Sequence, residues 1–466
     1  MIFVPLGKTE AIGANCYFLM IEGTGLIIDV GADPEEDGID SVPDFGFIHQ
    51  NPNWYVDHAL VTHAHHDHIG SLPVLIQNFP HVMVHMTKAT RDLADVVLPA
   101  SARLQQRRLR EGSSVHEPLF SEEELGVYNY LYLTHDLNTD FDVTGLKGTT
   151  KVKARFYSAG HILGSAGVLL RFEEEEGEER RVFYTSDTNM RPQSIIPGGE
   201  YPDPPIDVLF LESTLGADSE AELTTRRTEE RNFSDALESA IARKATVLIP
   251  VFALGRSQEV LALIHRFKQR GTIPAETPVY TAGSMRAFAE LYDKTRHNTP
   301  RLDPEFQVYD VDQIRLPRNR DAQRDALVGP SIHVVSSGMM FERTASNALA
   351  QQIVEDERNA VFLVGFARED SPADRLLVAA RQGKGTEAVL DTARGPQPIN
   401  CEVKKFRFSG HAHRRDLIEL VEKLKPRTVV LMHGEEEARR WMSDNIKFFY
   451  PHIHIAMAQT GQAARL

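Results

Sequence analysis

The segment 63–68 reads His-Ala-His-His-Asp-His and directly follows the apolar run 59–62, which predicts a strand. In extended backbone, successive side chains alternate between two faces, so His63 and His65 point to the same side. Two imidazoles at one side of a strand end are able to hold one metal ion. The pattern therefore predicts a metal site at the end of this strand. A histidine-rich surface loop is the non-functional alternative.

A second metal ion is predicted from the other half of the same segment. Asp67 and His68 lie where the chain turns into the apolar stretch 69–79, which predicts a helix. From there the two side chains can face a second metal. Imidazole and carboxylate ligands together suit zinc or a similar first-row cation.

A site for two metal ions needs more than four ligands, and the sequence supplies three more candidates at predicted strand ends. His161 follows Ser-Ala-Gly, Asp187 follows Tyr-Thr-Ser, and His433 precedes a glycine. Ligands at strand ends are held by a rigid sheet, which gives the precision that metal coordination requires. Each residue alone is more often a polar residue at the start of a loop. Together with the histidine-rich segment, they indicate a metal centre.

The elements that must position these residues change in character near residue 207. Short strands are predicted before it, at 1–4, 17–21, 25–30, 151–157 and 181–185. A helix is predicted over 87–98, and the basic stretch 103–110 is either a substrate contact or a solvated helix face. From 207 onward, strands alternate with helices, which predicts a largely parallel α/β unit. One of these helices is predicted to begin at Ser257 as its N-cap.

Composition indicates a soluble globular protein of two or three domains, or of one large domain with an insertion. Its 466 residues are 42% hydrophobic and 25% charged. No apolar stretch reaches the roughly 18 residues that span a bilayer, and the N-terminus does not resemble a signal peptide, so no membrane contact is expected. The two cysteines, Cys16 and Cys401, fit a reducing cytoplasm. The net charge of −15 argues against a protein that coats polyanions generally, but not against a nuclease.

The ligand segments, in this order and with Asp29 before them, resemble the metallo-β-lactamase fold. Four further segments resemble the β-CASP family of that fold, in its RNA-processing branch: 211–214, 249–256, 336–340 and 408–412. The resemblance spans nearly the whole chain.

The resemblance implies an α/β fold with two domains. In contrast to RNase J, no extra C-terminal domain is expected. Residues 1–207 and 395–466 would form an αβ/βα metallo-β-lactamase sandwich. Residues 208–394 would form an inserted α/β β-CASP domain, with the active site in the cleft.

The resemblance also implies the role of each ligand. One zinc ion is held by His63, His65 and His161, and the other by Asp67, His68 and His433. Asp187 bridges the two ions, and Asp29 orients the site from behind its ligands. Manganese in place of zinc stays open.

Glu212 and His411 match two further family motifs, in which the pair serves the leaving group. Two cations activate a bridging water and neutralise charge on the phosphoryl oxygens. His411, polarised by Glu212, is then expected to protonate the departing 3′ oxygen as a general acid. At the third motif position, His433, RNA-processing members have histidine and DNA-processing members typically have valine, which favours RNA.

We therefore expect a zinc-dependent ribonuclease of RNA processing or decay that leaves a 5′-phosphate and a 3′-hydroxyl. Its expected partner is single-stranded RNA, with a homodimer and membership of an RNA-processing complex both open. The sequence does not separate endonuclease from 5′-exonuclease action. Two other functions stay open: hydrolysis of a small ester, thioester or lactam, and a non-catalytic scaffold role. The Glu212–His411 pair argues against the first, and the complete ligand set argues against the second.

Substrate recognition is the part that the sequence determines least. Phosphate contacts are hypothesised for three residues, although a local structural hydrogen bond would explain each equally well. The three are Arg256, Ser337 and Ser409. The sequence departs from the family pattern at 341–343, at 365–370 and at His413, where an aspartate is usual. These departures remove no predicted ligand, but they leave the identity of the substrate open.

Overall fold

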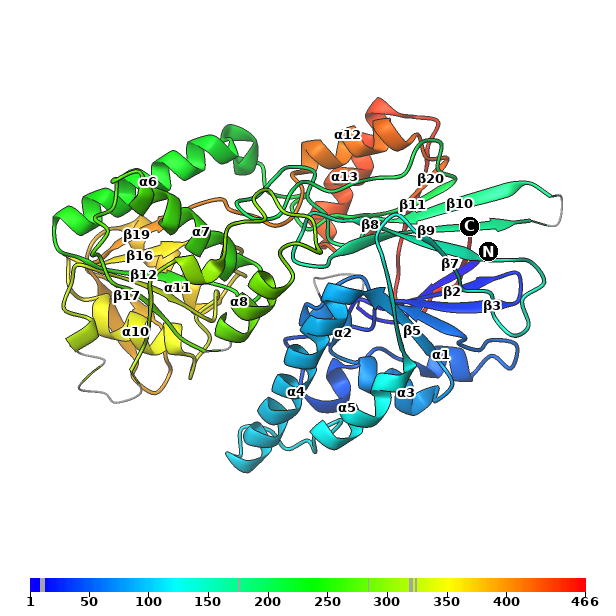
Figure 1. Ribbon diagram of the computed structural model, residues 1–466, viewed down its shortest axis with the longest axis horizontal. Helices are drawn as coiled ribbons and strands as arrows, with labels where there is room; N and C mark the ends of the chain where they lie inside the picture. Colours follow the sequence, from blue (N-terminus) through cyan, green and yellow to red (C-terminus); the bar gives the residue numbers. More distant parts are fainter. Residues whose placement is uncertain (9–12, 175–176, 284, 318–321, 323–324) are drawn as a thin grey trace. The chain divides into compact units, whose positions relative to one another are not determined.

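The structure is a computed structural model that describes residues 1–466 with the exception of 9–12, 175–176, 284, 318–321 and 323–324. It divides into two compact units (Figure 1). Unit 1 comprises Met1–Pro192, Gly198–Ser219 and His411–Leu466, and unit 2 comprises Gln193–Pro197 and Glu220–Gly410. The domain boundaries near 207 and 395 remain predictions from the sequence.

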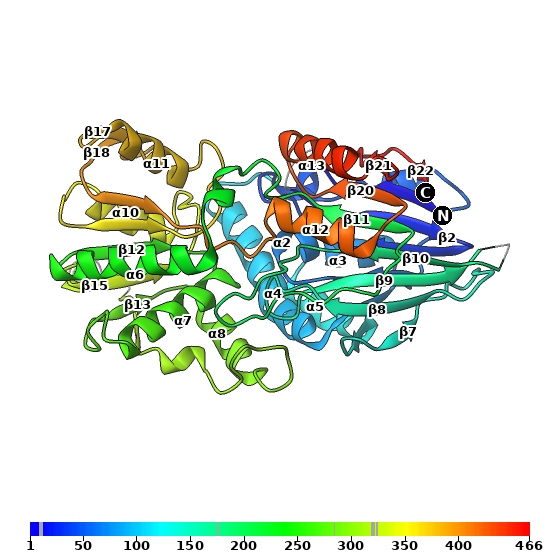
Figure 2. The ribbon, with the colours of Figure 1, turned by 90° about the horizontal axis from the view of Figure 1, so that it is seen from above.

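Unit 1 is built on two seven-stranded sheets. The first has the order β22 (Ala464–Arg465), β1 (Ile2–Pro5), β2 (Tyr17–Ile21), β3 (Thr24–Ile28), β4 (His58–Leu60), β5 (Met83–Thr87), β6 (Tyr132–His135). The second has the order β21 (His454–Met457), β20 (Thr428–Met432), β11 (Val208–Glu212), β10 (Glu179–Tyr184), β9 (Ala166–Glu173), β8 (Lys153–Ser158), β7 (Asp140–Asp142) (Figure 2).

The inner faces of the two sheets pack on each other, and helices cover the outer faces. The inter-sheet core includes Phe3 of the first sheet and Phe210 of the second, whose ring centroids are 4.9 Å apart. The first sheet is covered by α1 (Gly46–His49), α3 (Leu72–Asn78), α4 (Lys88–Arg110) and α5 (Glu122–Tyr128). The second is covered by α12 (Arg414–Leu424) and α13 (Glu436–Phe449). These four layers confirm the predicted αβ/βα sandwich.

The helix predicted over 87–98 is longer than expected, because α4 continues through Pro99 to Arg110. A proline inside a helix removes one hydrogen bond. Here, burial of Leu98 and Ala102 on either side of it keeps one face of the helix on the core. The basic stretch 103–110 is thus the end of α4, and Arg103 in it forms an ion pair with Glu122.

Unit 2 is built on a six-stranded sheet in which every pair of neighbours is parallel. Its order is β14 (Gln313–Arg315), β13 (Val279–Thr281), β15 (Ser331–Val335), β12 (Thr246–Pro250), β16 (Ala360–Leu363), β19 (Glu402–Lys405). A separate hairpin consists of β17 (Thr386–Val389) and β18 (Pro396–Ile399). This arrangement confirms the alternating α/β pattern predicted for this part of the chain.

Helices cover both faces of this sheet. They are α6 (Arg226–Ala242), α7 (Arg256–Gln269), α8 (Met285–Lys294), α10 (Ala345–Ile353) and α11 (Pro372–Gln382). Val361 and Leu363 of β16 pack with α10 and α11. Phe362, which points to the opposite face, lies against Phe233 of α6. Figure 1 likewise shows α6 and α7 on one side of the strands and α10 on the other.

The predicted start of α7 at Ser257 was wrong, because the N-cap is Gly255. Gly255 adopts a φ of 88°, which favours glycine, and its N–H donates to Gln258 Oε1 at 2.8 Å. The hydroxyl of Ser257 donates instead to the carbonyl oxygen of Ala253.

Gln193–Pro197 belongs to unit 2 because Glu259 of α7 holds it. The buried carboxylate accepts hydrogen bonds from the backbone N–H of Ser194, of Ile195 at 3.1 Å and of Ile196 at 3.2 Å. Several backbone donors on one carboxylate fix a segment that has no regular secondary structure. Among the described helices, none is both long and apolar enough to cross a membrane.

Three histidines on neighbouring strands of the first sheet form a chain of hydrogen bonds. His58 Nδ1 lies 3.0 Å from His85 Nε2, and His85 Nδ1 lies 2.9 Å from His135 Nε2. His58 Nε2 faces the carbonyl oxygen of Thr144 at 3.3 Å, so each ring donates from Nε2, and His58 and His85 accept at Nδ1. His58 and His85 satisfy this pattern only as neutral rings. Burial, together with His58 and His135, lowers the pKa of His85 to about 3.

We predict that this histidine chain makes unit 1 less stable in acid. Unfolded His85 takes up a proton below its ordinary pKa of 6.5, whereas folded His85 does so only near pH 3. The unfolded state binds more protons between these values, so stability falls as pH falls, by up to about 1.4 kcal/mol per pH unit. His85→Phe should therefore flatten the pH dependence of the free energy of unfolding, measured by denaturant titration. An unchanged slope in the variant would contradict the prediction.

Candidate metal centre

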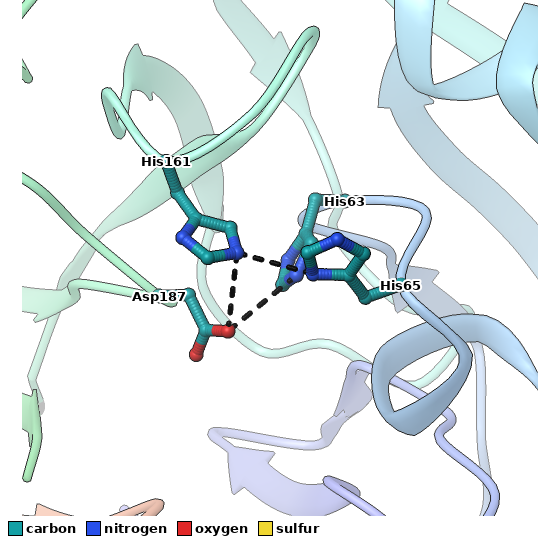
Figure 3. Close-up of side chains that lie close together, drawn as sticks. All are labelled: His63, His65, His161 and Asp187. Carbon is teal, nitrogen blue, oxygen red and sulfur yellow. Dashed lines mark hydrogen bonds and ion pairs between the residues drawn. The ribbon is translucent and has the colours of Figure 1, made fainter. Parts of the chain in front are cut away.

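The segment that follows β4 brings the first predicted ligands together. His63 lies three residues after the end of β4, and His65 precedes the short helix α2 (His66–Ile69) with φ −69° and ψ 150°. The ligand atoms of four side chains all lie within 4.8 Å of one another (Figure 3). The four are His63, His65, His161 and Asp187. His161 Nε2 is 3.1 Å from His65 Nδ1 and 3.6 Å from Asp187 Oδ2.

A second group forms on the other side of the Asp187 carboxylate. Ligand atoms of Asp67, His68 and His433 lie within 4.8 Å of one another. His68 Nε2 is 3.4 Å and His433 Nδ1 is 3.0 Å from Asp187 Oδ1, the oxygen that faces away from the first group. Asp187 thus presents one oxygen to each group. The structure brings all seven predicted ligands into two adjacent clusters, and their binding of metal stays a prediction.

The chemistry of these donors fits two divalent cations. The set consists of five imidazoles and two carboxylates, which suits zinc or a similar first-row ion. His63 Nε2 is fully buried and makes no hydrogen bond to any residue that the structure describes. A buried polar atom without a partner costs about 1–3 kcal/mol, and a bound cation would remove that cost.

Asp29 fixes the imidazole ring of His68, a member of the second group, on the side away from Asp187. Its Oδ2 lies 2.8 Å from His68 Nδ1, and it accepts hydrogen bonds from the hydroxyl groups of Thr62 at 2.9 Å and Tyr184 at 3.0 Å. Its Oδ1 accepts the backbone N–H of Thr62 at 2.8 Å. Because Nδ1 of His68 faces Asp29, Nε2 is the ring nitrogen that faces Asp187 and is placed to hold a metal ion. Sequence reasoning missed Thr62 and Tyr184, although Thr62 directly precedes the first ligand.

Glu212 and His411 meet at the edge of the two groups. Glu212 ends β11, where its Oε1 accepts the backbone N–H of Thr188 at 2.7 Å and its Oε2 lies 3.0 Å from His411 Nδ1. Ligand-type atoms of both residues lie within 4.8 Å of those of Asp187 and His433. Burial alone lowers the pKa of His411, but the carboxylates of Glu212 and Asp187 outweigh it and raise the pKa to about 9. The raised pKa fits the role of proton donor, which stays a prediction for His411. Sequence reasoning missed Thr188.

The three residues predicted to contact phosphate all lie in unit 2. Arg256 begins α7 and is buried. Burial and the neighbouring Arg226 lower its pKa to about 10. Ser337 Oγ is buried without a hydrogen-bond partner among the described residues, and Ser409 is half-buried. Their contact with substrate stays a prediction.

His413, which departs from the family pattern, has a structural role in unit 1. It is the N-cap of α12, and its Nδ1 accepts the backbone N–H of Arg415 at 3.4 Å. An aspartate would cap the helix in the same way. The departure therefore leaves the predicted ligands undisturbed.

Comparison with known protein families identifies three consecutive regions. Residues 10–129 match the metallo-beta-lactamase superfamily, and residues 257–376 match the Beta-Casp domain. Residues 396–457 match the Zn-dependent metallo-hydrolase RNA specificity domain. The first two matches follow the order that the sequence motifs predicted, and the RNA specificity domain was not among the predictions.

Individual relatives are similar over most of the chain. Endoribonuclease YSH1 of Eremothecium gossypii is 28% identical over 453 residues, which is 93% of this chain but 55% of that protein, so the chain spans little more than half of this relative. An RNase J-like protein of Methanocaldococcus jannaschii is 26% identical over 439 residues, which is 92% of this chain and 91% of that protein. A solved structure of an Enterococcus faecalis V583 protein covers 100% of this chain and 99% of its own, with a TM-score of 0.57 and 12% identity, and supports the fold alone.

We predict that Asp29→Asn weakens metal binding roughly 10- to 100-fold. The carboxylate of Asp29 takes part in four hydrogen bonds. The asparagine amide has one acceptor oxygen in its place and lacks the negative charge that orients His68. Tyr184→Phe, which removes a single one of these hydrogen bonds, is the matched control and should have a much smaller effect. Competition with a zinc-chelating dye measures both affinities. Equal affinity in Asp29→Asn and wild type would contradict the role of Asp29.

Proposed function

We infer the function from the family: the chain belongs to the β-CASP family of metallo-β-lactamase-fold proteins, and we propose that it is a zinc-dependent ribonuclease. The observation that carries the proposal is the placement of Asp187. Its two oxygens face two clusters of ligand atoms, with the His411–Glu212 pair beside them. Phosphodiester hydrolysis by a two-metal mechanism uses these parts: a site for two cations and a proton donor for the leaving oxygen.

Two zinc ions, when bound, supply an activated water and neutralise the charge that builds on the phosphoryl oxygens. His63, His65 and His161 would hold one ion, and Asp67, His68 and His433 the other. Asp187 would be shared. The imidazole ring of His68 is fixed from behind by Asp29. The hydroxyl oxygen of Thr214 lies 2.9 Å from His433 Nδ1, the atom that also faces Asp187.

His411 supplies the proton for the departing 3′ oxygen. Glu212 binds its Nδ1, which leaves Nε2 as the atom that donates. Bound cations would lower the pKa of His411, and the carboxylate of Glu212 would oppose that shift. The products of this reaction are a 5′-phosphate and a 3′-hydroxyl.

RNA is the proposed substrate because the RNA specificity domain matches residues 396–457 and His433 occupies the position at which RNA-processing members carry histidine. Arg256, Ser337 and Ser409 are proposed as phosphate contacts. Zinc is proposed over manganese because imidazoles dominate the ligand set. A cytoplasmic location, and assembly as a homodimer or within an RNA-processing complex, remain predictions.

His65→Ala should abolish cleavage of single-stranded RNA, with a loss of roughly 10³-fold or more, because it removes a ligand of the first cation. The assay uses RNA labelled at its 5′ end beside the matching DNA, with and without chelator. His66→Ala changes a histidine of the same segment that belongs to neither ligand cluster and should keep activity. Released mononucleotide would indicate 5′-exonuclease action, and longer fragments endonuclease action.

Wild-type turnover by His65→Ala would refute the metal assignment. No cleavage of either polymer by metal-loaded wild type would refute the ribonuclease proposal. It would leave hydrolysis of a small ester, thioester or lactam, or a scaffold role in an RNA-processing complex.

His411→Ala should slow cleavage roughly 10²- to 10⁴-fold while the protein keeps its bound metal, because a general acid and not a ligand is lost. Metal content by mass spectrometry and single-turnover rates measure the two effects. An RNA in which sulfur replaces the departing 3′ oxygen should restore much of the rate, since a thiolate leaves without a proton. Loss of both metal ions in His411→Ala would show that His411 is a ligand instead.

A further inference from the structure

The carboxyl edge of the six-stranded sheet in unit 2 carries three exposed phenylalanines. Phe252 follows β12, Phe341 lies after β15, and Phe366 follows β16, with exposed fractions of 36%, 39% and 40%. Of the 23 phenylalanines in the chain, two others are exposed to this extent among the described residues, Phe448 and Phe449 of α13 in unit 1. Clustered exposure of large apolar side chains indicates a binding surface.

The segments that carry these three rings lie against one another, and we call the three residues the phenylalanine edge. A Cβ added at Gly338 would lie 3.2 Å from the Phe252 ring, and one added at Gly365 would lie 3.6 Å from it. The Phe252 ring therefore rests on the backbone of the segments that follow β15 and β16. The guanidinium of Arg368 lies over the Phe341 ring, 6.0 Å from its centroid.

The topology of unit 2 places this surface where open α/β sheets bind ligands. Strands β12 and β15 are parallel neighbours, but the helices that follow them, α7 and α10, lie on opposite faces of the sheet (Figure 1). When the connections that follow two neighbouring strands run to opposite faces of the sheet, a crevice is left at the carboxyl ends of those strands. Ser337 Oγ, buried and without a hydrogen-bond partner among the described residues, lies in the segment after β15.

The charges around the phenylalanine edge favour bases over phosphates as the bound groups. Arg343 and Arg368 are offset by Glu369 and Asp370, so these four residues carry no net positive charge. Aromatic rings and a guanidinium plane are the groups on which unpaired nucleobases stack. Two of the segments involved, 341–343 and 365–370, depart from the family pattern in sequence, whereas Phe252 lies in a segment that resembles it.

We propose that the phenylalanine edge stacks unpaired bases of single-stranded RNA and thereby contributes to substrate affinity. The proposal rests on the proposed ribonuclease function for its ligand. Because stacking dominates over phosphate contacts, the contribution of these residues to affinity changes little with salt. Because each base has an aromatic face, binding is tolerant of sequence.

The test measures dissociation constants by fluorescence anisotropy with 5′-labelled single-stranded RNA, in the His65→Ala background so that the RNA stays intact. Phe341→Ala and Phe366→Ala should each weaken binding roughly 5- to 150-fold, as expected for the loss of one stacked base. Phe341→Trp should retain affinity. Phe448→Ala, which removes an exposed ring from unit 1, is the matched control and should bind as the background does.

An RNA with abasic nucleotides separates stacking from a general structural effect. It should bind more weakly than the intact RNA to the background protein, and Phe341→Ala together with Phe366→Ala should weaken its binding little further. If the variants weaken binding of abasic and intact RNA equally, the stacking proposal is wrong.

Cleavage by the otherwise wild-type protein is measured in parallel to separate two kinds of failure. If that protein cuts RNA and both phenylalanine variants bind as tightly as Phe448→Ala, the phenylalanine edge does not bind bases, and the ribonuclease proposal stands. If the protein neither cuts nor binds RNA, the ribonuclease proposal fails and the stacking proposal fails with it. Variants that bind normally but lose a protein partner would show that the edge serves protein association.

Discussion

The position of one carboxylate, that of Asp187, is the constraint on which unit 1 depends. Each of its oxygens must face a different cluster of imidazoles, so the elements that carry both clusters have to converge on it. The histidine-rich segment comes from the first sheet, and His161 and His433 come from the second. Neither ligand cluster can be completed by residues of a single sheet. Two sheets packed face to face therefore meet the requirement.

Backbone conformation at the strand ends makes this convergence possible. Asp29, Ser186 and His433 follow β3, β10 and β20, and each has a positive φ, between 47° and 58°. Such a conformation costs roughly 1–3 kcal/mol for a residue other than glycine and persists where the surroundings determine it. Here the surrounding structure is the paired sheet together with hydrogen bonds such as those of Asp29. The same sharp turns direct the polar side chains toward one point.

Much of the site was predictable because its signals are local. Seven ligands of matching chemistry at strand ends identify a metal centre without any knowledge of strand pairing. Thr188 and Tyr184 were not predictable, since their roles depend on which strands are neighbours: Thr188 meets Glu212 only because β10 pairs with β11. The predictions of helix ends were wrong for a different reason. At Pro99 and Ser257, tertiary burial and a glycine conformation decided where the helices run, against the local signals.

The two units differ in how strongly their functional residues are constrained. In unit 1 each ligand also takes part in a buried network, so a change at His68 disturbs Asp29 and, through it, Thr62. In unit 2 the residues at the carboxyl edge of the sheet lie in loops, and Phe341 and Phe366 are 39% and 40% exposed. Such positions exchange side chains at small cost to stability. The departures from the family pattern at 341–343 and 365–370 lie where a change in substrate preference leaves the fold and the predicted metal ligands intact.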